Sequence, residues 1–154
     1  MTGMPRLLIA HHTPSPSCQA MLEAVRAGAT DDAIEGVEVV LRPALAATAT
    51  DVLEADAYLL GTPANIGYMS GALKHFFDQI YYPVLEHTTG RGYGLFVHGN
   101  NDTTGAERAV ASIATGLGWK PVRDVVRVVG EVGQADLDAC WELGAATAAG
   151  LMAG

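Results

Sequence analysis

The stretch that decides the fold is residues 61–78, GTPANIGYMSGALKHFFD. It follows a short apolar run, residues 57–60, of the kind that forms a buried strand. It ends inside a helix, because its later apolar residues recur on one side of a 3.6-residue repeat: Leu73, Phe76, Phe77, Ile80 and Val84. Between strand and helix we expect a loop of about ten residues, which is long for such a connection. Loops at the carboxyl ends of strands are where open α/β sheets bind ligands.

Apolar runs elsewhere in the chain predict the other strands of a sheet. They lie at residues 7–10, 37–41 and 93–98, with a fifth strand within residues 122–129. Pro43 is expected to close the second strand, and Pro83 to end or kink the helix of the opening stretch. Strands and helices then alternate along the chain, which indicates a parallel sheet covered on both faces.

Cap residues mark where the remaining helices begin. Ser15 precedes a proline and caps one helix, Thr50 caps a short helix over residues 51–55, and Thr104 with Glu107 forms a capping box. The last helix is expected over residues 134–149. Its inward positions are Leu137, Cys140, Trp141, Gly144 and Ala148.

The alternation leaves few topologies, because crossovers between parallel strands are right-handed. One of them has five strands in the order 2-1-3-4-5, with its switch point between the first and third strands. The loops over residues 13–18 and 63–70 then lie side by side at that point. The loop over residues 99–103 closes the far edge.

Length and composition restrict the classes of function that the protein can have. The 154 residues, 49% hydrophobic, predict a single domain spanning 1–154. A net charge of −8 argues against nucleic acid or an anionic membrane as a partner. No apolar run reaches the ~20 residues of a membrane span, and two cysteines make no disulfide framework, so we expect a cytoplasmic protein. The five histidines follow no metal-ligand spacing, and we predict no metal site.

The first loop is suited to an anion. Thr13, Ser15 and Ser17 place three hydroxyls at a helix amino terminus, where free N–H groups and the helix dipole attract negative charge. No lysine or arginine lies between Arg6 and Arg26, so a phosphate held here is bound by neutral donors. The alternative is that the serines only cap the helix.

The other two loops are suited to a planar ring. Ile66 and Tyr68 give the second loop an apolar surface, and the amides of Asn100 and Asn101 in the third suit a ring edge rich in carbonyls and nitrogens. The alternatives are a surface aromatic and ordinary turn chemistry. Phosphate at one loop and a heteroaromatic ring across the others describe a mononucleotide.

The opening stretch matches the pattern G-T-P-x-x-x-G-x-M-x-G-x-x-K-x-F-x-D, and here the chain resembles flavodoxin-like FMN proteins. It is most similar to their NAD(P)H-dependent FMN or quinone reductase branch. The resemblance implies a flavodoxin-like three-layer fold with FMN in the crevice. By position it implies these FMN-binding residues: Thr13, Ser15, Ser17 and Cys18; Pro63, Ala64, Asn65, Ile66, Gly67 and Tyr68; His98, Gly99, Asn100 and Asn101.

The resemblance implies an oxidoreductase that passes electrons from NAD(P)H through FMN to a quinone, a free flavin or a similar small acceptor. No side chain is required as a general acid or base. One alternative is a flavodoxin-type one-electron carrier without substrate turnover. Another is a member that has lost FMN, since Pro16 and Cys18 stand where the family's phosphate loop has glycine and threonine. Tyr68, Tyr81 and Tyr82 are candidates for a homodimer contact.

Overall fold

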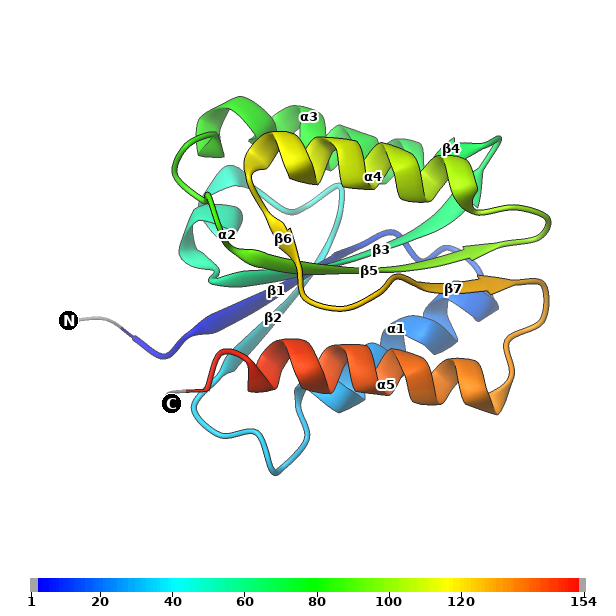
Figure 1. Ribbon diagram of the computed structural model, residues 1–154, viewed down its shortest axis with the longest axis horizontal. Coiled ribbons are helices and arrows are strands. Elements are labelled where there is room, and N and C mark those ends of the chain that lie inside the picture. The colour runs from blue at the N-terminus through cyan, green and yellow to red at the C-terminus, as the bar shows by residue number, and fades with distance from the viewer. Residues whose placement is uncertain (1–2, 153–154) are drawn as a thin grey trace.

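The protein is a three-layer α/β sandwich, seen here in a computed structural model that describes residues 3–152 (Figure 1). The strands are β1 (Arg6–His11), β2 (Glu38–Pro43), β3 (Ala57–Asn65), β4 (Tyr68–Met69), β5 (Gly92–Gly99), β6 (Lys120–Pro121) and β7 (Val126–Val129). The helices are α1 (Pro16–Ala29), α2 (Ala49–Glu54), α3 (Gly71–Val84), α4 (Thr104–Leu117) and α5 (Gln134–Ala149). Helices α1 and α5 cover one face of the sheet, and α2, α3 and α4 cover the other.

The sheet order is β2-β1-β3-β5-β6, with β7 also paired to β5. All these pairs are parallel, and only β4 runs antiparallel, on β3. In the order of the predicted strands this is 2-1-3-4-5, so the predicted topology is confirmed. The carboxyl ends of β1, β3 and β5 lie at one end of the molecule, on the right in Figure 1.

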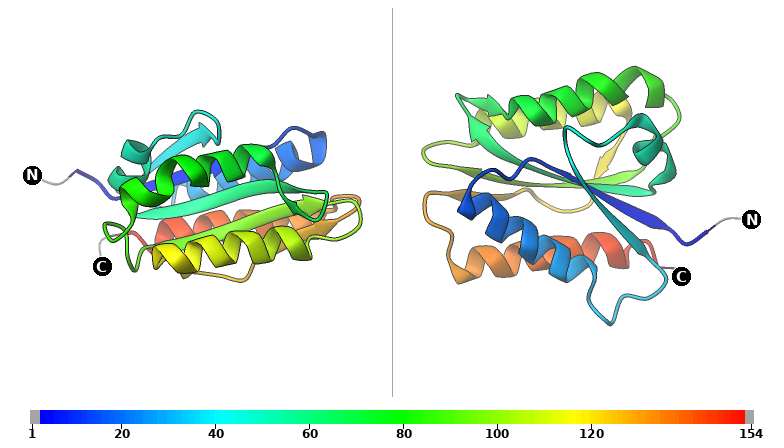
Figure 2. Two further views of the ribbon diagram at one scale, coloured as in Figure 1. Left: turned by 90° about the horizontal axis from the view of Figure 1, so that it is seen from above. Right: turned by 180° about the vertical axis from the view of Figure 1, so that it is seen from behind.

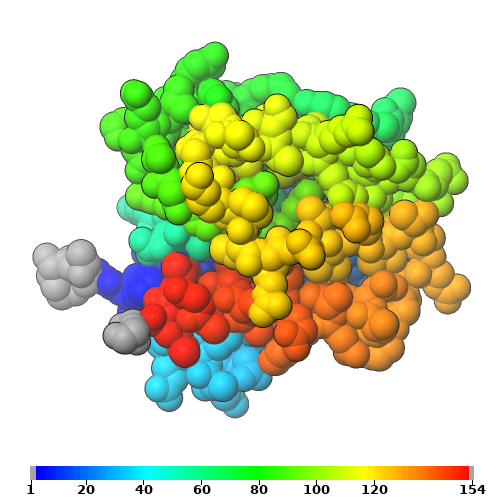
Figure 3. All heavy atoms as spheres, viewed as in Figure 1, coloured from blue at the N-terminus to red at the C-terminus, as the bar shows by residue number. Residues whose placement is uncertain are grey.

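The predicted fifth strand is broken into β6 and β7. Three steps along β5, from Tyr93 to Phe96, oppose five steps along the edge, from Pro121 to Val126. The two extra residues leave the ladder as a bulge, which is common at sheet edges. Pro121, which lacks an N–H, is tolerated there. In Figure 3 this edge segment, residues 120–129, crosses the surface between α4 and α5.

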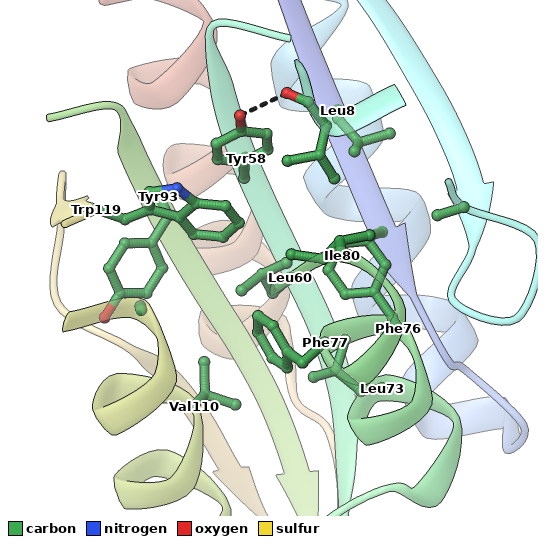
Figure 4. Close-up of a cluster of buried hydrophobic side chains, with 14 of the residues drawn as sticks. Leu8, Tyr58, Leu60, Leu73, Phe76, Phe77, Ile80, Tyr93, Val110 and Trp119 are labelled. Carbon is green, nitrogen blue, oxygen red and sulfur yellow. Dashed lines mark hydrogen bonds between the residues drawn. The ribbon is translucent and has the colours of Figure 1, made fainter. Parts of the chain in front are cut away.

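The core under α3 and α4 is built around stacked aromatic rings (Figure 4). Tyr58 and Trp119 stack with their centroids 4.1 Å apart, and Phe77 packs beside them. The polar atoms of this cluster are paired: the Tyr58 hydroxyl donates to the Val52 carbonyl (2.6 Å) and Trp119 Nε1 donates to Thr88 Oγ1 (2.9 Å). The five predicted apolar positions of α3 are all buried, as expected.

The core on the other face brings α1 against α5, which lie side by side when seen from behind (Figure 2). Cys140 is buried there, and desolvation raises the pKa of its thiol to about 12, so the thiol stays protonated and serves packing. The prediction that Trp141 points inward is wrong, since 38% of it is exposed and Leu143 is buried instead. Where α1 meets Trp141, the two backbones are in contact at Gly28, so no space remains for an indole.

Two predicted caps are also wrong. The residue that caps α2 is Thr48 rather than Thr50, and it forms a capping box with Asp51. Helix α4 follows Thr103, whose hydroxyl donates to Glu107, while Thr104 is already the first helical residue. In both cases a threonine one or two residues earlier in the chain takes the cap position. Within residues 3–152, no helix combines the length and apolar character that crossing a membrane requires.

Candidate functional site

The three loops singled out in the sequence meet in one cleft at the carboxyl ends of β1, β3 and β5. The cleft has a volume of about 260 Å³. Its lining residues are Pro14, Ser15, Ser17, Pro63, Ala64, Asn65, His98, Gly99 and Asn100. The topology explains the convergence, because β1 and β3 are neighbours in the sheet although α1, β2 and α2 separate them in sequence.

The first loop ends in the amino terminus of α1. Ser15 is the cap residue, and its Oγ accepts a hydrogen bond from the Cys18 N–H (3.1 Å). Ser17 reaches the cleft from the first turn, whereas the Cys18 side chain is buried beneath the loop, only 3% exposed. Of the predicted residues, Ser15 and Ser17 therefore line the cleft and Cys18 does not.

Thr13, also predicted, lies outside the cleft lining. Its Oγ1 lies 3.1 Å from His11 Nδ1 and donates to the Gln19 Oε1 (3.3 Å). Burial lowers the pKa of His11, with a further contribution from the neighbouring His12. A neutral His11 that carries its proton on Nδ1 completes this chain of hydrogen bonds, which runs from the end of β1 to the first turns of α1.

The second loop is a β-hairpin and not the long loop expected from sequence. Strand β3 continues to Asn65, turns over Ile66 and Gly67, both with positive φ (49° and 73°), and returns as β4. Asn65 pairs directly with Tyr68, so the connection is a two-residue turn. The strand face presents Pro63, Ala64 and Asn65 to the cleft, while Ile66, Gly67 and Tyr68 lie beyond its lining.

A buried hydroxyl anchors this hairpin to α3. Thr62, only 2% exposed, accepts a hydrogen bond from the Ser70 N–H (3.0 Å) and donates to the Pro63 carbonyl (2.7 Å). Ser70 in turn caps α3, accepting from the Leu73 N–H (3.2 Å). Thr62 was absent from the predicted site, although the family pattern that identified the loop contains it.

We predict that Thr62→Val lowers the free energy of unfolding by about 2 kcal/mol, because it leaves the buried Ser70 N–H without its partner. Affinity for the FMN that the resemblance implies should fall with it, since the hairpin that forms one wall loses its anchor. Urea denaturation and a flavin titration measure the two effects. Thr62→Ser, which keeps the hydroxyl, is the matched control, and a valine variant as stable as the parent contradicts the assignment.

The third loop is held from two sides. His98, only 8% exposed, has Nε2 2.6 Å from the Gly130 carbonyl oxygen, so this nitrogen donates and the ring is directed to the end of β7. A Cβ on Gly99 would come within 3.2 Å of Ala64 Cβ, so glycine permits the close approach of the second and third loops. Asn100 lines the cleft, and the predicted Asn101 does not.

An ion pair ties the third loop to the sheet edge. Arg127 on β7 donates two hydrogen bonds to the Glu107 carboxylate on α4 (2.8 Å each), and Thr103 donates a third (2.6 Å). These donors, Arg127 foremost, hold the pKa of Glu107 below its ordinary value. Sequence reasoning missed this support, because the two residues lie 20 positions apart and no motif joins them.

The composition of the cleft fits a flavin. None of its nine lining residues is a lysine, arginine, aspartate or glutamate. The α1 terminus with its two serine hydroxyls provides donors for a phosphate, and the strand ends offer Pro63 and Ala64 as an apolar surface with Asn65 and Asn100 as amide partners.

Comparison with known proteins agrees with this geometry. Residues 14–134 match the family described as NADPH-dependent FMN reductase. The chain belongs to this family. The match includes all nine residues that line the cleft.

Similarity to flavodoxins accompanies the family match. A flavodoxin from Aquifex aeolicus (strain VF5) is 33% identical over 114 residues, which is 74% of this chain and 60% of that protein's own length. Among solved structures, a flavodoxin from the domain Archaea superposes with a TM-score of 0.81 at 18% identity, covering 96% of this chain and 99% of that one. A WrbA-like flavodoxin from Agrobacterium tumefaciens gives 0.71 at 18% identity, covering 95% and 96%.

The protein is therefore a flavodoxin-like member of the FMN reductase family, and FMN is its cofactor. This agrees with the predicted fold and cofactor.

Proposed function

We propose that this FMN reductase-family protein is an NAD(P)H-dependent oxidoreductase that passes electrons to a quinone, a free flavin or a similar small acceptor. The observation that carries the proposal is the cleft itself. It joins a helix amino terminus to two uncharged strand ends, in a chain that matches an NADPH-dependent family over residues 14–134.

In this proposal the chain binds and orients FMN by its three loops. Residues 13–18 receive the phosphate, and residues 63–68 and 98–101 flank the ring system. When bound, FMN would supply the redox chemistry, namely hydride transfer from a nicotinamide and electron transfer to the acceptor. The protein fixes the orientation of the ring through the Thr62 anchor on one side and the Glu107–Arg127 pair on the other. No side chain needs to act as a general acid or base.

The third loop supports substrate access. It consists of small and polar residues, Gly99, Asn100, Asn101, Asp102 and Thr103, and has no aromatic side chain to stack on a ring. A planar substrate can then approach the ring from that side. This favours turnover of small molecules over a covered ring that only exchanges electrons at its edge.

Steady-state oxidation of NADPH and NADH by the FMN-loaded protein tests the proposal. A quinone, free FMN and an artificial dye serve as acceptors, and protein without added flavin is the control. We expect turnover with at least one acceptor. If neither nucleotide is oxidised with any acceptor, the proposed enzymatic function is wrong.

A one-electron carrier is the second candidate. It is favoured by the similarity to the Aquifex flavodoxin and by the net charge of −8, which suits docking to a basic redox partner. Photoreduction distinguishes the two functions. A carrier should show two separated one-electron steps in its visible spectrum, and a reductase should pass to the fully reduced form in one step.

A further inference from the structure

We infer that the free edge of strand β7 is a docking surface for a basic, extended segment of a partner protein, which adds to the sheet as one more strand. A hollow beside this edge receives alternate side chains of that segment. The inference goes beyond the proposed function and does not depend on flavin chemistry. It rests on the backbone of β7, on the hollow between β7 and α5, and on the charges around that hollow.

Strand β7 offers an open backbone edge. It is paired to β5 on one side, and in Figure 3 it lies on the surface with no other described segment in front of it. The N–H of Gly130, directly after β7, donates to the Gly99 carbonyl (2.8 Å), so this residue faces β5. Successive residues of a strand direct their backbone groups to opposite sides, so the N–H and C=O groups of Arg127 and Val129 face outward. An added strand can pair with these groups.

The protection of this edge ends where β7 begins. Exposed sheet edges are usually protected by charges, prolines and bulges. Residues 120–125 have all three, since they contain a lysine, a proline, an arginine and an aspartate as well as the bulge. Residues 126–129 pair regularly with β5 and carry a single charge, that of Arg127, which two hydrogen bonds direct to Glu107 on α4. The edge of β7 itself is therefore accessible to a strand.

A hollow of about 470 Å³ lies between this edge and α5. Val126 and Leu143 give it apolar walls, and Ala139 contributes a small side chain. Val126 packs against the core on the α5 face, whereas the side chain of Arg127 reaches α4. A strand added beside β7 places every second side chain on the α5 face, where these side chains enter the hollow. In this mode of recognition, backbone hydrogen bonds give affinity and pockets for alternate side chains give specificity.

The charges around the hollow favour a basic segment. The carboxylates of Asp124, Asp136 and Glu142 line it, and none of them forms an ion pair within residues 3–152. Of the two arginines in the lining, Arg127 is already paired to α4, so Arg123 alone opposes the three carboxylates. A lysine or arginine of the bound segment adds attraction to them. A second copy of this chain is a poorer occupant, because it brings the same carboxylates and a net charge of −8.

A peptide titration of the full chain, with FMN present, tests the inference. The probe is an eight-residue peptide of alternating lysine and valine, capped at both ends and labelled with a dye, and its fluorescence anisotropy is followed. We expect saturable binding with a dissociation constant below about 1 mM. The matched peptide of alternating glutamate and valine should bind at least about fivefold more weakly. Absence of saturable binding, or equal affinity for the two peptides, overturns the inference.

A proline at the edge tests the backbone pairing. Val129→Pro removes an outward N–H and leaves the bonds to β5 in place, and edge strands tolerate proline. We expect it to weaken binding of the lysine peptide by at least about fivefold, whereas Val129→Thr, which keeps the N–H, stays within about twofold. Thermal unfolding establishes that both variants are folded. Equal affinity of the two variants overturns the inference.

A charge substitution on α5 tests the choice of a basic segment. Glu142→Gln should weaken binding of the lysine peptide by about threefold. Asp138→Asn, which removes a carboxylate from the same helix outside the lining, should stay within about 1.5-fold. Equal losses in both variants contradict a role for the hollow. Sedimentation of the chain alone measures self-association, and a dimer that Val129→Pro disrupts assigns the edge to a second copy and overturns the partner segment.

Discussion

Gly144→Val is expected to lower the free energy of unfolding by about 3 kcal/mol or more, the range of severe overpacking in a core. Gly144 lies on α5 where it crosses α1. A Cβ built there would lie 2.0 Å from the Val25 carbonyl oxygen and 3.0 Å from the Ala29 nitrogen. Both are backbone atoms, so no rotamer change can relieve the contact. The helices themselves must separate.

Helix α1 also carries a glycine at its close contact with α5. A Cβ on Gly28 of α1 would lie 2.0 Å from the Trp141 carbonyl oxygen, so two glycines, one on each helix, allow the backbones to touch. Separating the helices there would also open the core of Met21, Val25, Cys140 and Leu143 beneath them. The cost therefore includes lost burial in addition to the local clash.

Urea denaturation followed by circular dichroism measures the effect. The control is Ala139→Val, the same final residue on an exposed position of α5, for which helix propensity alone predicts a loss of about 0.6 kcal/mol. If Gly144→Val proves as stable as that control, the helices do not pack as closely as described. Flavin affinity in the folded fraction should be little changed, because this contact lies below the sheet and away from the cleft.

The strands could be predicted from sequence because a sheet covered on both faces needs continuous apolar runs. The residue at which β3 ends could not be predicted in this way. Gly61 was interpreted as the start of a loop, yet it lies within the strand, where a Cβ would come 2.3 Å from the Phe96 ring. A glycine required by a neighbouring strand's side chain looks the same in sequence as a glycine required by a turn. Pro63 and Asn65 are also residue types that are common in turns and loops.

The candidate site could also be predicted only in part. The meeting of the three loops follows from strand order, which the alternation of elements dictates. The direction of each side chain does not follow from it. The resemblance implies that Thr13 and His98 bind the ligand. The structure directs the Thr13 hydroxyl to Gln19, whereas His98 lines the cleft with its Nε2 bonded to the Gly130 carbonyl. Each of these hydrogen bonds depends on where folding brings the partner residue, and such a bond leaves no pattern in the sequence.

Gly105→Ala is expected to weaken binding of both FMN and riboflavin by about tenfold or more, which corresponds to 1.4 kcal/mol. Gly105 is in the first turn of α4, and a Cβ there would lie 1.8 Å from the carbonyl oxygen of Gly67, at the tip of the β3–β4 hairpin. The atom that the new Cβ would meet is again a backbone atom, so a rotamer change cannot relieve the contact. Either the hairpin or the start of α4 must move by more than about 1 Å to restore ordinary contact.

Movement of either segment changes the cleft, because the hairpin carries Ala64 and Asn65 while α4 follows the loop that carries Asn100. Both flavins should be affected, since in the proposed binding mode the displaced walls face the ring and not the phosphate. Gly71→Ala is the matched control: it makes the same change in the first turn of α3, beside the same hairpin, and its Cβ would meet nothing within 4 Å. Fluorescence titration of both folded variants decides the point. Equal flavin affinity in Gly105→Ala and Gly71→Ala means that the hairpin tip does not set the geometry of the cleft.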